Sequence, residues 1–340
     1  MARESKRSGV ALALGSGSAR GLAHVGILNV FEEVGVPVNA IAGTSIGAIV
    51  GGLYSGGGLD GWVELMRGMD RQAVVWFLDP VLPVSGLFGG KRTKRVLHSL
   101  VGERRIELLK IPFCAVACDL ADGSEVRITK GELVEAMRSS YAIPGFFTPI
   151  KVADRWLSDG GAVAPVPVAA ARDFGLSHLI AVDLHSESYV TPGSEPLPTA
   201  LGAAKDAPEP SEAAKKRSEE LLYQMADFVS DAASKVAGKA AHFWRRVIGR
   251  GPRKGAPSLP DVIGDTMAFA QMTIAQRDLE LHPADLVLTP RLPDIGIFDY
   301  HRAAEIIAEG ERCTREAHEK GLLDPFIKMG KGKTKWFNAS

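Results

Sequence analysis

Ser45 stands between Gly43 and Gly47 and is the sequence's best candidate for a nucleophile. Residues 38–42 before it are apolar and short enough for a buried strand, and residues 48–54 after it are compatible with a helix. A tight strand-to-helix turn of this kind needs glycines on both sides and leaves the serine hydroxyl exposed above the sheet. The dipole of the following helix favours negative charge near Ser45. The same pattern also fits a tight turn without chemistry.

A glycine-rich loop precedes this turn, between an expected strand at residues 9–14 and an expected helix. Its residues are Gly15, Ser16, Gly17, Ser18, Ala19, Arg20 and Gly21. Backbone N–H groups in such a loop point at an anion. A dinucleotide phosphate is one choice, but Arg20 replaces the third glycine of that fingerprint, and Ala40 and Ile41 lie where an acid is usual. The oxyanion of an ester under attack is the other choice, with the amides of Gly17 and Ser18 as donors.

Asp159 is the candidate base. It ends a short expected strand and precedes Gly160 and Gly161, so its carboxylate is held close to the backbone. By itself this pattern is also typical of an Asx-type turn. Together with Ser45 and the anion loop it suffices for acyl transfer: Ser45 attacks an ester carbonyl, and Asp159 takes the proton and returns it to the leaving alcohol.

Two histidines lie near these motifs, and His185 is the one candidate for an alternative base. His24 falls in the helix after the glycine-rich loop, and His185 follows an expected strand at residues 177–184. A carboxylate is a weak base for an alcohol unless its site is partly desolvated. His185 would complete a Ser, Asp, His order, although a histidine at a strand end is more often structural.

Alternating strand and helix patterns over residues 9–185 predict an open α/β sheet, mostly parallel, with helices on both faces. The further expected elements are strands at 111–120, 125–129 and 284–288 and helices within 60–110 and at 133–140, 261–279 and 300–318. Trp62, Leu65 and Met69 are expected on one helical face. The basic run at residues 91–95 is interpreted as a solvated helical face and not a nucleic-acid site, because no aromatic residue is interleaved with it.

Composition excludes several classes of protein. The 340 residues are 46% hydrophobic and 24% charged with a formal net charge of zero, which is ordinary globular material. No apolar run approaches the ~20 residues of a membrane span, and the start lacks the apolar stretch of a signal peptide, so a cytoplasmic protein is expected. Cys114, Cys118 and Cys313 lack metal-ligand spacing and are expected to be buried thiols, without metal or cofactor.

A composition shift at Ser186 opens an expected insertion at residues 186–260. The insertion begins as a linker rich in Pro, Gly, Ser and Glu and continues as a basic amphipathic helix at residues 218–254. We expect this helix to lie on anionic lipid through Phe243, Trp244, Arg245 and Arg246, each cation contributing ~1 kcal/mol. A helix docked on the domain or in a dimer is the alternative. The remaining expected divisions are a basic tail at 1–8, a core at 9–185 continued at 261–325, and a second basic tail at 326–340.

These segments together resemble the patatin-like phospholipases, most closely the compact bacterial branch related to the catalytic domain of neuropathy target esterase. The matching segments, in chain order, are residues 15–26, 43–47, 118–120, 142–145, 159–161 with 165–167, and 284–288. The resemblance covers roughly residues 9–185 and 261–310. As a set in this order, the motifs are highly specific.

The resemblance implies a three-layer α/β/α patatin-like fold with a mostly parallel central sheet, to which this chain adds the helical insertion. It also implies a dyad of Ser45 and Asp159, no metal or cofactor, and hydrolysis of acyl esters in phospholipids or lysophospholipids through an acyl-enzyme. The implied oxyanion loop comprises Gly15, Gly17, Ser18, Ala19 and Arg20. We expect such a protein to be peripheral on the inner face of the membrane, and its oligomeric state, including a homo-oligomer, is left open. The alternatives are a soluble general esterase that uses the insertion as a lid or dimer arm, and a non-catalytic lipid- or nucleotide-binding module.

Overall fold

A computed structural model of the chain describes residues 7–79, 81, 85–186 and 259–330. The chain divides into two units, residues 1–190 with 264–340 and residues 191–263, and the description below concerns the first of them. The expected basic helix at residues 218–254, with Phe243, Trp244, Arg245 and Arg246, lies outside the described residues. No helix within the described ranges is long and apolar enough to cross a membrane.

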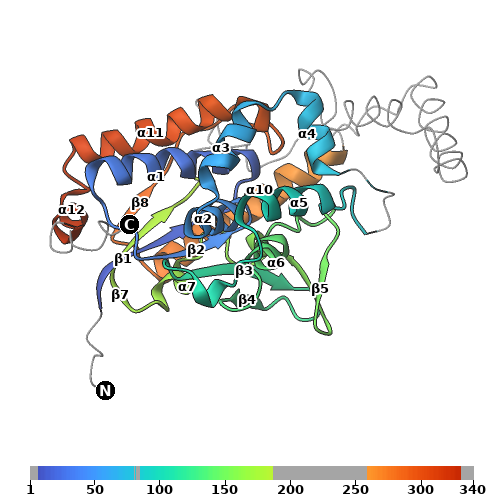
Figure 1. The fold of residues 1–340 in the computed structure, drawn as a ribbon, viewed down its shortest axis with the longest axis horizontal. Coiled ribbons are helices and arrows are strands. Elements are labelled where there is room, and N and C mark those ends of the chain that lie inside the picture. Colours follow the sequence, from blue (N-terminus) through green and yellow to red (C-terminus); the bar gives the residue numbers. More distant parts are fainter. Residues whose placement is uncertain (1–6, 80, 82–84, 187–258, 331–340) are drawn as a thin grey trace, which may run out of the picture. The chain divides into compact units, whose positions relative to one another are not determined.

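Eight strands of the described residues form one mixed sheet (Figure 1). They are β1 (Arg7–Leu14), β2 (Ala40–Thr44), β3 (Phe113–Asp119), β4 (Glu125–Ile128), β5 (Ile150–Val152), β6 (Arg155–Asp159), β7 (Leu176–Val182) and β8 (Leu286–Leu288). Their order is β5-β6-β3-β2-β1-β7-β8, and β4 also pairs with β3. The five strands from β3 to β8 in this order run parallel, whereas β4 and β6 are antiparallel to β3 and β5 is antiparallel to β6. The prediction of a mostly parallel α/β sheet is confirmed.

Helices cover both faces of this sheet. They are α1 (Ala23–Val34), α2 (Ile46–Gly56), α3 (Leu59–Arg67), α4 (Arg71–Leu78), α5 (Lys91–Val101), α6 (Leu133–Ser140), α7 (Val168–Arg172), α10 (Leu259–Leu281), α11 (Ala303–Glu319) and α12 (Asp324–Gly330). Short 3-10 turns occur at η1 (Ser18–Leu22), η2 (Ile106–Leu108), η3 (Gly160–Ala162) and η4 (Tyr300–Arg302). Helices α1 and α11 lie side by side over one face (Figure 1).

The alternation of side chains along the strands separates two buried layers. On the face of α2, the backbone at Gly51 comes close to the side chains of Leu14, Ile41 and Phe113. On the opposite face, small residues of β1 and β2 form a cluster with α7 and with Ala275 of α10. The three layers therefore place the carboxyl ends of β1 and β2, and the loops that follow them, beside both sets of helices.

Strand β5 and helix α7 were not predicted from the sequence, and three further differences concern element boundaries. The first strand begins at Arg7 and not at Gly9, because the Arg7 amide donates to the Gly175 carbonyl at 3.0 Å. Residues 326–330, expected in a basic tail, belong to α12, where Phe326 is buried against the ring of His178. The region 60–110 is broken into α3, α4, α5 and η2.

Two side-chain expectations also need comment. Trp62 and Met69 are buried and Leu65 is 37% exposed, and Met69 lies beyond the end of α3, so the three side chains do not form the single helical face that was expected. Cys114 and Cys118 are buried free thiols as expected, whereas Cys313 is only partly buried. Burial raises the pKa of the Cys114 thiol, which keeps it protonated and unreactive.

Candidate active site

Ser45 occupies the turn between β2 and α2 with a backbone φ of 57° and ψ of −121°. Side-chain-bearing residues rarely adopt a positive φ, so this turn is strained. Its flanking glycines are required by close packing, because an added Cβ would lie 2.4 Å from the Gly47 oxygen at Gly43 and 2.1 Å from the Leu14 oxygen at Gly47. Ser45 itself is only 3% exposed, so the hydroxyl lies inside a cavity and not openly above the sheet as the turn pattern suggested.

A second serine holds this turn in place. Ser140, the last residue of α6, accepts a hydrogen bond from the Ser45 amide at 2.8 Å. The Ser140 hydroxyl in turn donates to the Val116 carbonyl in β3 at 2.5 Å. Sequence reasoning did not single out Ser140, and the only available signal was a serine at the end of a helix before an apolar loop.

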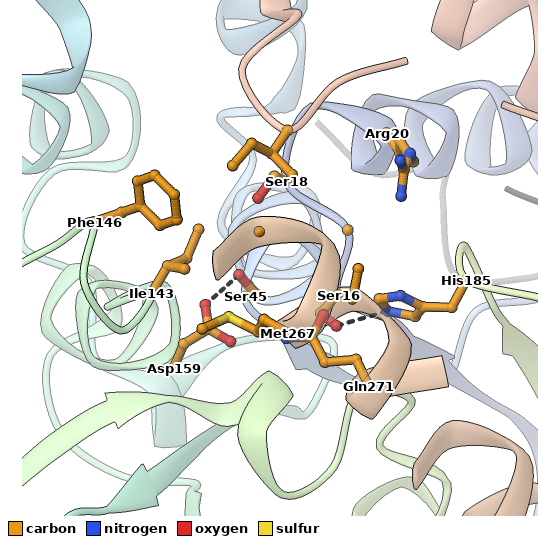
Figure 2. Close-up of a pocket in the computed structure, with 14 residues that line it drawn as sticks. Ser16, Ser18, Arg20, Ser45, Ile143, Phe146, Asp159, His185, Met267 and Gln271 are labelled. Carbon is orange, nitrogen blue, oxygen red and sulfur yellow. Dashed lines mark hydrogen bonds between the residues drawn. The ribbon is translucent and has the colours of Figure 1, made fainter. Parts of the chain in front are cut away.

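Asp159 lies beside Ser45 although 114 positions separate the two in the chain. Strand β6 pairs antiparallel with β3 and ends at Asp159, and the following turn is tight because an added Cβ at Gly160 would lie 2.2 Å from the Val116 oxygen. Asp159 Oδ2 accepts a 2.5 Å hydrogen bond from Ser45 Oγ (Figure 2). Asp159 Oδ1 accepts one from the Gly161 amide at 2.7 Å.

Burial changes the acidity of this carboxyl group. Asp159 is 2% exposed, and loss of solvent raises its pKa to about 7, although the hydrogen bonds from Ser45 and Gly161 act in the opposite direction. A carboxylate with such a pKa is a stronger base than an ordinary aspartate. The desolvation that a carboxylate base requires is therefore present at this position.

Only some of the backbone amides in the glycine-rich loop donate hydrogen bonds within the protein. Those of Gly15, Ser16, Ala19 and Arg20 donate to the carbonyls of Val182, Pro165, Ile297 and Gly17, respectively. Within the described ranges, the amides of Gly17 and Ser18 donate to no protein acceptor. Ser18 has a positive φ of 51°, which turns the backbone sharply at this point. Gly15, Ala19 and Arg20 thus shape the loop, and Gly17 and Ser18 retain available donors.

Arg20 is 2% exposed and helps to anchor the loop. Its Nε donates to the Ile295 carbonyl at 2.9 Å, which ties the loop to the segment that follows β8. Ile297 of the same segment lines the cavity in front of Ser45. Arg20 therefore connects the glycine-rich loop with a distant part of the cavity wall.

The two candidate histidines do not contact Ser45. His24 Nε2 donates to the Gly15 carbonyl at 2.8 Å, and burial lowers the pKa of His24 to about 4. His185 lines the cavity, but its Nε2 lies 3.0 Å from Ser16 Oγ (Figure 2). Burial also lowers the pKa of His185 to about 4. Ser45 is hydrogen-bonded to Asp159 instead, so the geometry favours the carboxylate as the base.

A cavity of about 40 Å³ lies in front of Ser45 and Asp159. Apolar side chains form one part of its wall, namely Ile143, Phe146, Met267, Ala268 and Ile297. This volume has room for a few water molecules or for the reacting ester group. The sequence reading missed the contribution of α10 and of Ile297, since neither carries a motif. No set of three or more His, Cys, Asp or Glu side chains in the described part of the chain is arranged to hold a metal ion.

Comparison with known proteins gives consistent matches. The family model described as patatin-like phospholipase matches residues 12–172, which include Ser45 and Asp159. An uncharacterised NTE family protein of Mycobacterium tuberculosis is 32% identical over 353 residues, covering 95% of this chain and 94% of that protein. The human patatin-like phospholipase domain-containing protein 6 is 34% identical over 185 residues, 52% of this chain and 13% of the human protein. The alignment with the crystal structure of VipD from Legionella pneumophila covers 94% of this chain and 67% of the VipD chain, with a TM-score of 0.42 and 12% sequence identity.

Proposed function

Because this chain belongs to the patatin-like phospholipase family, in its group related to neuropathy target esterase, we propose that it hydrolyses acyl esters of phospholipids or lysophospholipids with a Ser45–Asp159 dyad. The observation that carries the proposal is the 2.5 Å hydrogen bond from Ser45 Oγ to the buried Asp159 carboxylate. A hydroxyl nucleophile in direct contact with a base is the arrangement that covalent acyl transfer requires.

In the first half of the reaction, Ser45 Oγ attacks the ester carbonyl carbon while Asp159 Oδ2 takes the hydroxyl proton. The tetrahedral intermediate collapses, the proton passes from Asp159 to the leaving alcohol, and an acyl-enzyme on Ser45 remains. The raised pKa of Asp159, about 7, suits both steps, because a group that titrates near neutral pH both accepts and returns a proton readily.

Charge on the intermediate needs donors close to Ser45. The amides of Gly17 and Ser18 are the available donors of the glycine-rich loop within the described ranges, and both residues line the cavity with Ser45. The N-terminus of α2, which starts at Ile46, adds its dipole at the same place. We propose that these groups stabilise the oxyanion. Removal of one such donor typically lowers kcat about 10²- to 10³-fold.

The substrate class follows from the family and from the character of the cavity wall. Ile143, Phe146, Met267 and Ile297 offer an apolar surface beside the nucleophile, which suits a fatty acyl chain better than a polar acid.

A fluorophosphonate probe, which reacts with activated serines, tests the proposal. We expect labelling of the full-length protein that is lost in Ser45→Ala and retained in Ser55→Ala. Ser55 is a control on the helix that follows Ser45, and its hydroxyl has no hydrogen-bond partner among the described residues. We expect Asp159→Asn to remain folded and to lose nearly all turnover. Retained turnover would point to another base.

Substrate choice separates the proposal from its alternatives. Faster turnover of phospholipid or lysophospholipid than of short soluble esters supports the lipid hydrolase, and the reverse order supports a general esterase. Absence of labelling together with tight nucleotide or lipid binding would support a non-catalytic module. Removal of residues 218–254 should weaken sedimentation with anionic vesicles if that segment contacts the membrane.

A further inference from the structure

Polar atoms from three separate segments converge beside Gly161. A Cβ placed on Gly161 would lie 2.5 Å from Gln271 Nε2, 2.9 Å from Asp159 Oδ1 and 3.2 Å from Ser16 Oγ. These side chains come from α10, from the end of β6 and from the loop after β1, and all three line the cavity that Ser45 also lines (Figure 2). These atoms lie so close to Gly161 that a methyl group there would collide with them, so the position requires a glycine.

The Ser16 hydroxyl in this cluster is held by His185. The two side chains are 2% and 1% exposed, and Ser16 Oγ lies 3.0 Å from His185 Nε2. His185 is fixed in turn, since its amide donates to Asp183 Oδ1 at 2.8 Å. A hydroxyl has one proton and two lone pairs, so one contact with Nε2 leaves Ser16 Oγ at least one lone pair in either tautomer of the ring.

Gln271 supplies the complementary function. Its side chain has no hydrogen-bond partner among the residues that the structure describes, its Nε2 lies close to Gly161, and Gln271 lines the cavity. The cluster therefore offers an N–H donor, a hydroxyl acceptor and the carboxylate of Asp159 on one part of the cavity wall. These are the partners that a water molecule needs, because water has two protons to donate and two lone pairs.

We propose that Asp159, Ser16 and Gln271 bind the water that hydrolyses the acyl-enzyme, with His185 as the positioning residue for Ser16. The inference rests on the proposed acyl-enzyme at Ser45. The water donates one proton to Asp159 and the other to Ser16 Oγ, and it accepts a hydrogen bond from Gln271 Nε2. One lone pair is left to attack the acyl carbonyl carbon.

The step balances without any further reactant. A bond forms between the water oxygen and the acyl carbon, and the bond between that carbon and Ser45 Oγ breaks. The water proton passes to Asp159 and then to Ser45 Oγ, so that the fatty acid leaves and both side chains return to their starting state. Attack by Ser45 on the substrate does not use this water, so Ser16 and Gln271 affect the second half of the reaction only.

Two measurements on the full-length protein separate the halves of the reaction. The rate of fluorophosphonate labelling reports activation of Ser45, and acid-quenched mass spectrometry during turnover of a p-nitrophenyl ester reports the fraction of acyl-enzyme. We expect Ser16→Ala and Gln271→Leu to keep the labelling rate within about threefold, to lose about 10- to 100-fold in kcat, and to accumulate acyl-enzyme.

Matched controls are available for both changes. Ser177 also contacts a histidine, His178 Nδ1 at 2.8 Å, but outside the cavity lining, and Gln276 lies on the exposed side of α10. Ser177→Ala and Gln276→Leu should change neither quantity. If labelling and turnover fall together in Ser16→Ala and Gln271→Leu, with no accumulation of acyl-enzyme, the assignment is wrong. A wild-type protein that is not labelled at all would instead refute the proposed function.

Separate variants test whether His185 acts on deacylation through Ser16. His185→Leu should accumulate acyl-enzyme as Ser16→Ala does, and the double variant should be no slower than either single variant, because both remove the same contact. His185→Gln, whose amide can still bond Ser16 Oγ, should restore most of the lost deacylation rate. Additive losses, or no rescue by glutamine in a variant with an unchanged melting temperature, would show that His185 does not act through Ser16.

Discussion

Ser140 fixes the backbone of Ser45 through a single hydroxyl group, which accepts the Ser45 amide proton at 2.8 Å and donates to the Val116 carbonyl at 2.5 Å. The contact joins the end of α6 to the turn after β2 and to the middle of β3. Ser45 has a strained backbone, and because it is nearly fully buried, bulk water does not replace Ser140 as the hydrogen-bond acceptor of its amide. Ser140 is therefore part of what holds the serine in contact with Asp159.

Replacing Ser140 with alanine should lower both stability and activity. The change leaves a buried amide without an acceptor, which costs about 1–3 kcal/mol in the free energy of unfolding, and we expect kcat to fall about tenfold or more as the turn loosens. Ser139→Ala is the matched control, because Ser139 is equally buried on the same helix but donates only to the Glu135 carbonyl. Urea unfolding and ester turnover check both effects, and similar losses in the two variants would remove Ser140 from this role.

Comparison of the sequence with the structure shows which features of the site are predictable from local sequence patterns. The turn at Ser45, the strand ending at Asp159 and the loop with Gly17 and Ser18 were predicted because each depends on glycines at fixed neighbouring positions. The contacts of Ser16 with His185 and of Ser140 with Ser45 join residues 169 and 95 positions apart. The order of the strands in the sheet brings such distant residues together, and no local sequence pattern predicts these contacts.

Helix boundaries were also missed. The region 60–110 was predicted as helical although its sequence contains the helix breakers Pro80, Pro83 and Gly86, and Asp79 and Gly90 adopt left-handed conformations at the end of α4 and the start of α5. The last helix α12 was missed because it is only 7 residues long and contains Pro325, although tertiary packing buries Phe326. At α12, tertiary contacts decided against the local preference.

The pH dependence of turnover should follow Asp159. A base works only when deprotonated, so with a pKa of about 7 we expect kcat/KM to rise about tenfold per pH unit below pH 7 and to level off above it. An ordinary exposed aspartate would give a profile that is already flat above pH 5. Measurement between pH 5 and 9 with a soluble ester distinguishes the two cases, and a profile that is flat from pH 5 would contradict the raised pKa.

His24 should make the fold sensitive to acid. Burial lowers its pKa from 6.5 to about 4, so the unfolded chain binds a proton that the folded chain does not, and stability is lost as pH falls from about 6.5 towards 4. The loss attributable to His24 at pH 4.5 is about 2–3 kcal/mol. In His24→Gln, which can still donate to the Gly15 carbonyl, this part of the loss should disappear.

Urea unfolding at pH 7 and pH 4.5 measures the contribution of His24. The exposed His282, which directly follows α10, provides the control, and His282→Gln should change the difference in stability between the two pH values by only a few tenths of a kcal/mol. If His24→Gln loses as much stability on acidification as the wild-type protein, the histidine is protonated in the folded state and the assignment of a neutral ring is wrong.

Strain at Ser45 should appear as a stability difference between two inactive variants. Ser45→Ala and Ser45→Gly both remove the hydroxyl and its hydrogen bond to Asp159, so the loss of this bond contributes equally to the free energy of unfolding of both variants. Only glycine adopts the φ of 57° without steric conflict, so Ser45→Gly should be more stable than Ser45→Ala by about 1 kcal/mol. At Ser139, inside α6, the order should reverse, because glycine destabilises a helix by about 1 kcal/mol relative to alanine. Opposite signs at the two serines in urea unfolding would establish the strain, whereas alanine being the more stable choice at both would mean that the turn relaxes and stores no energy.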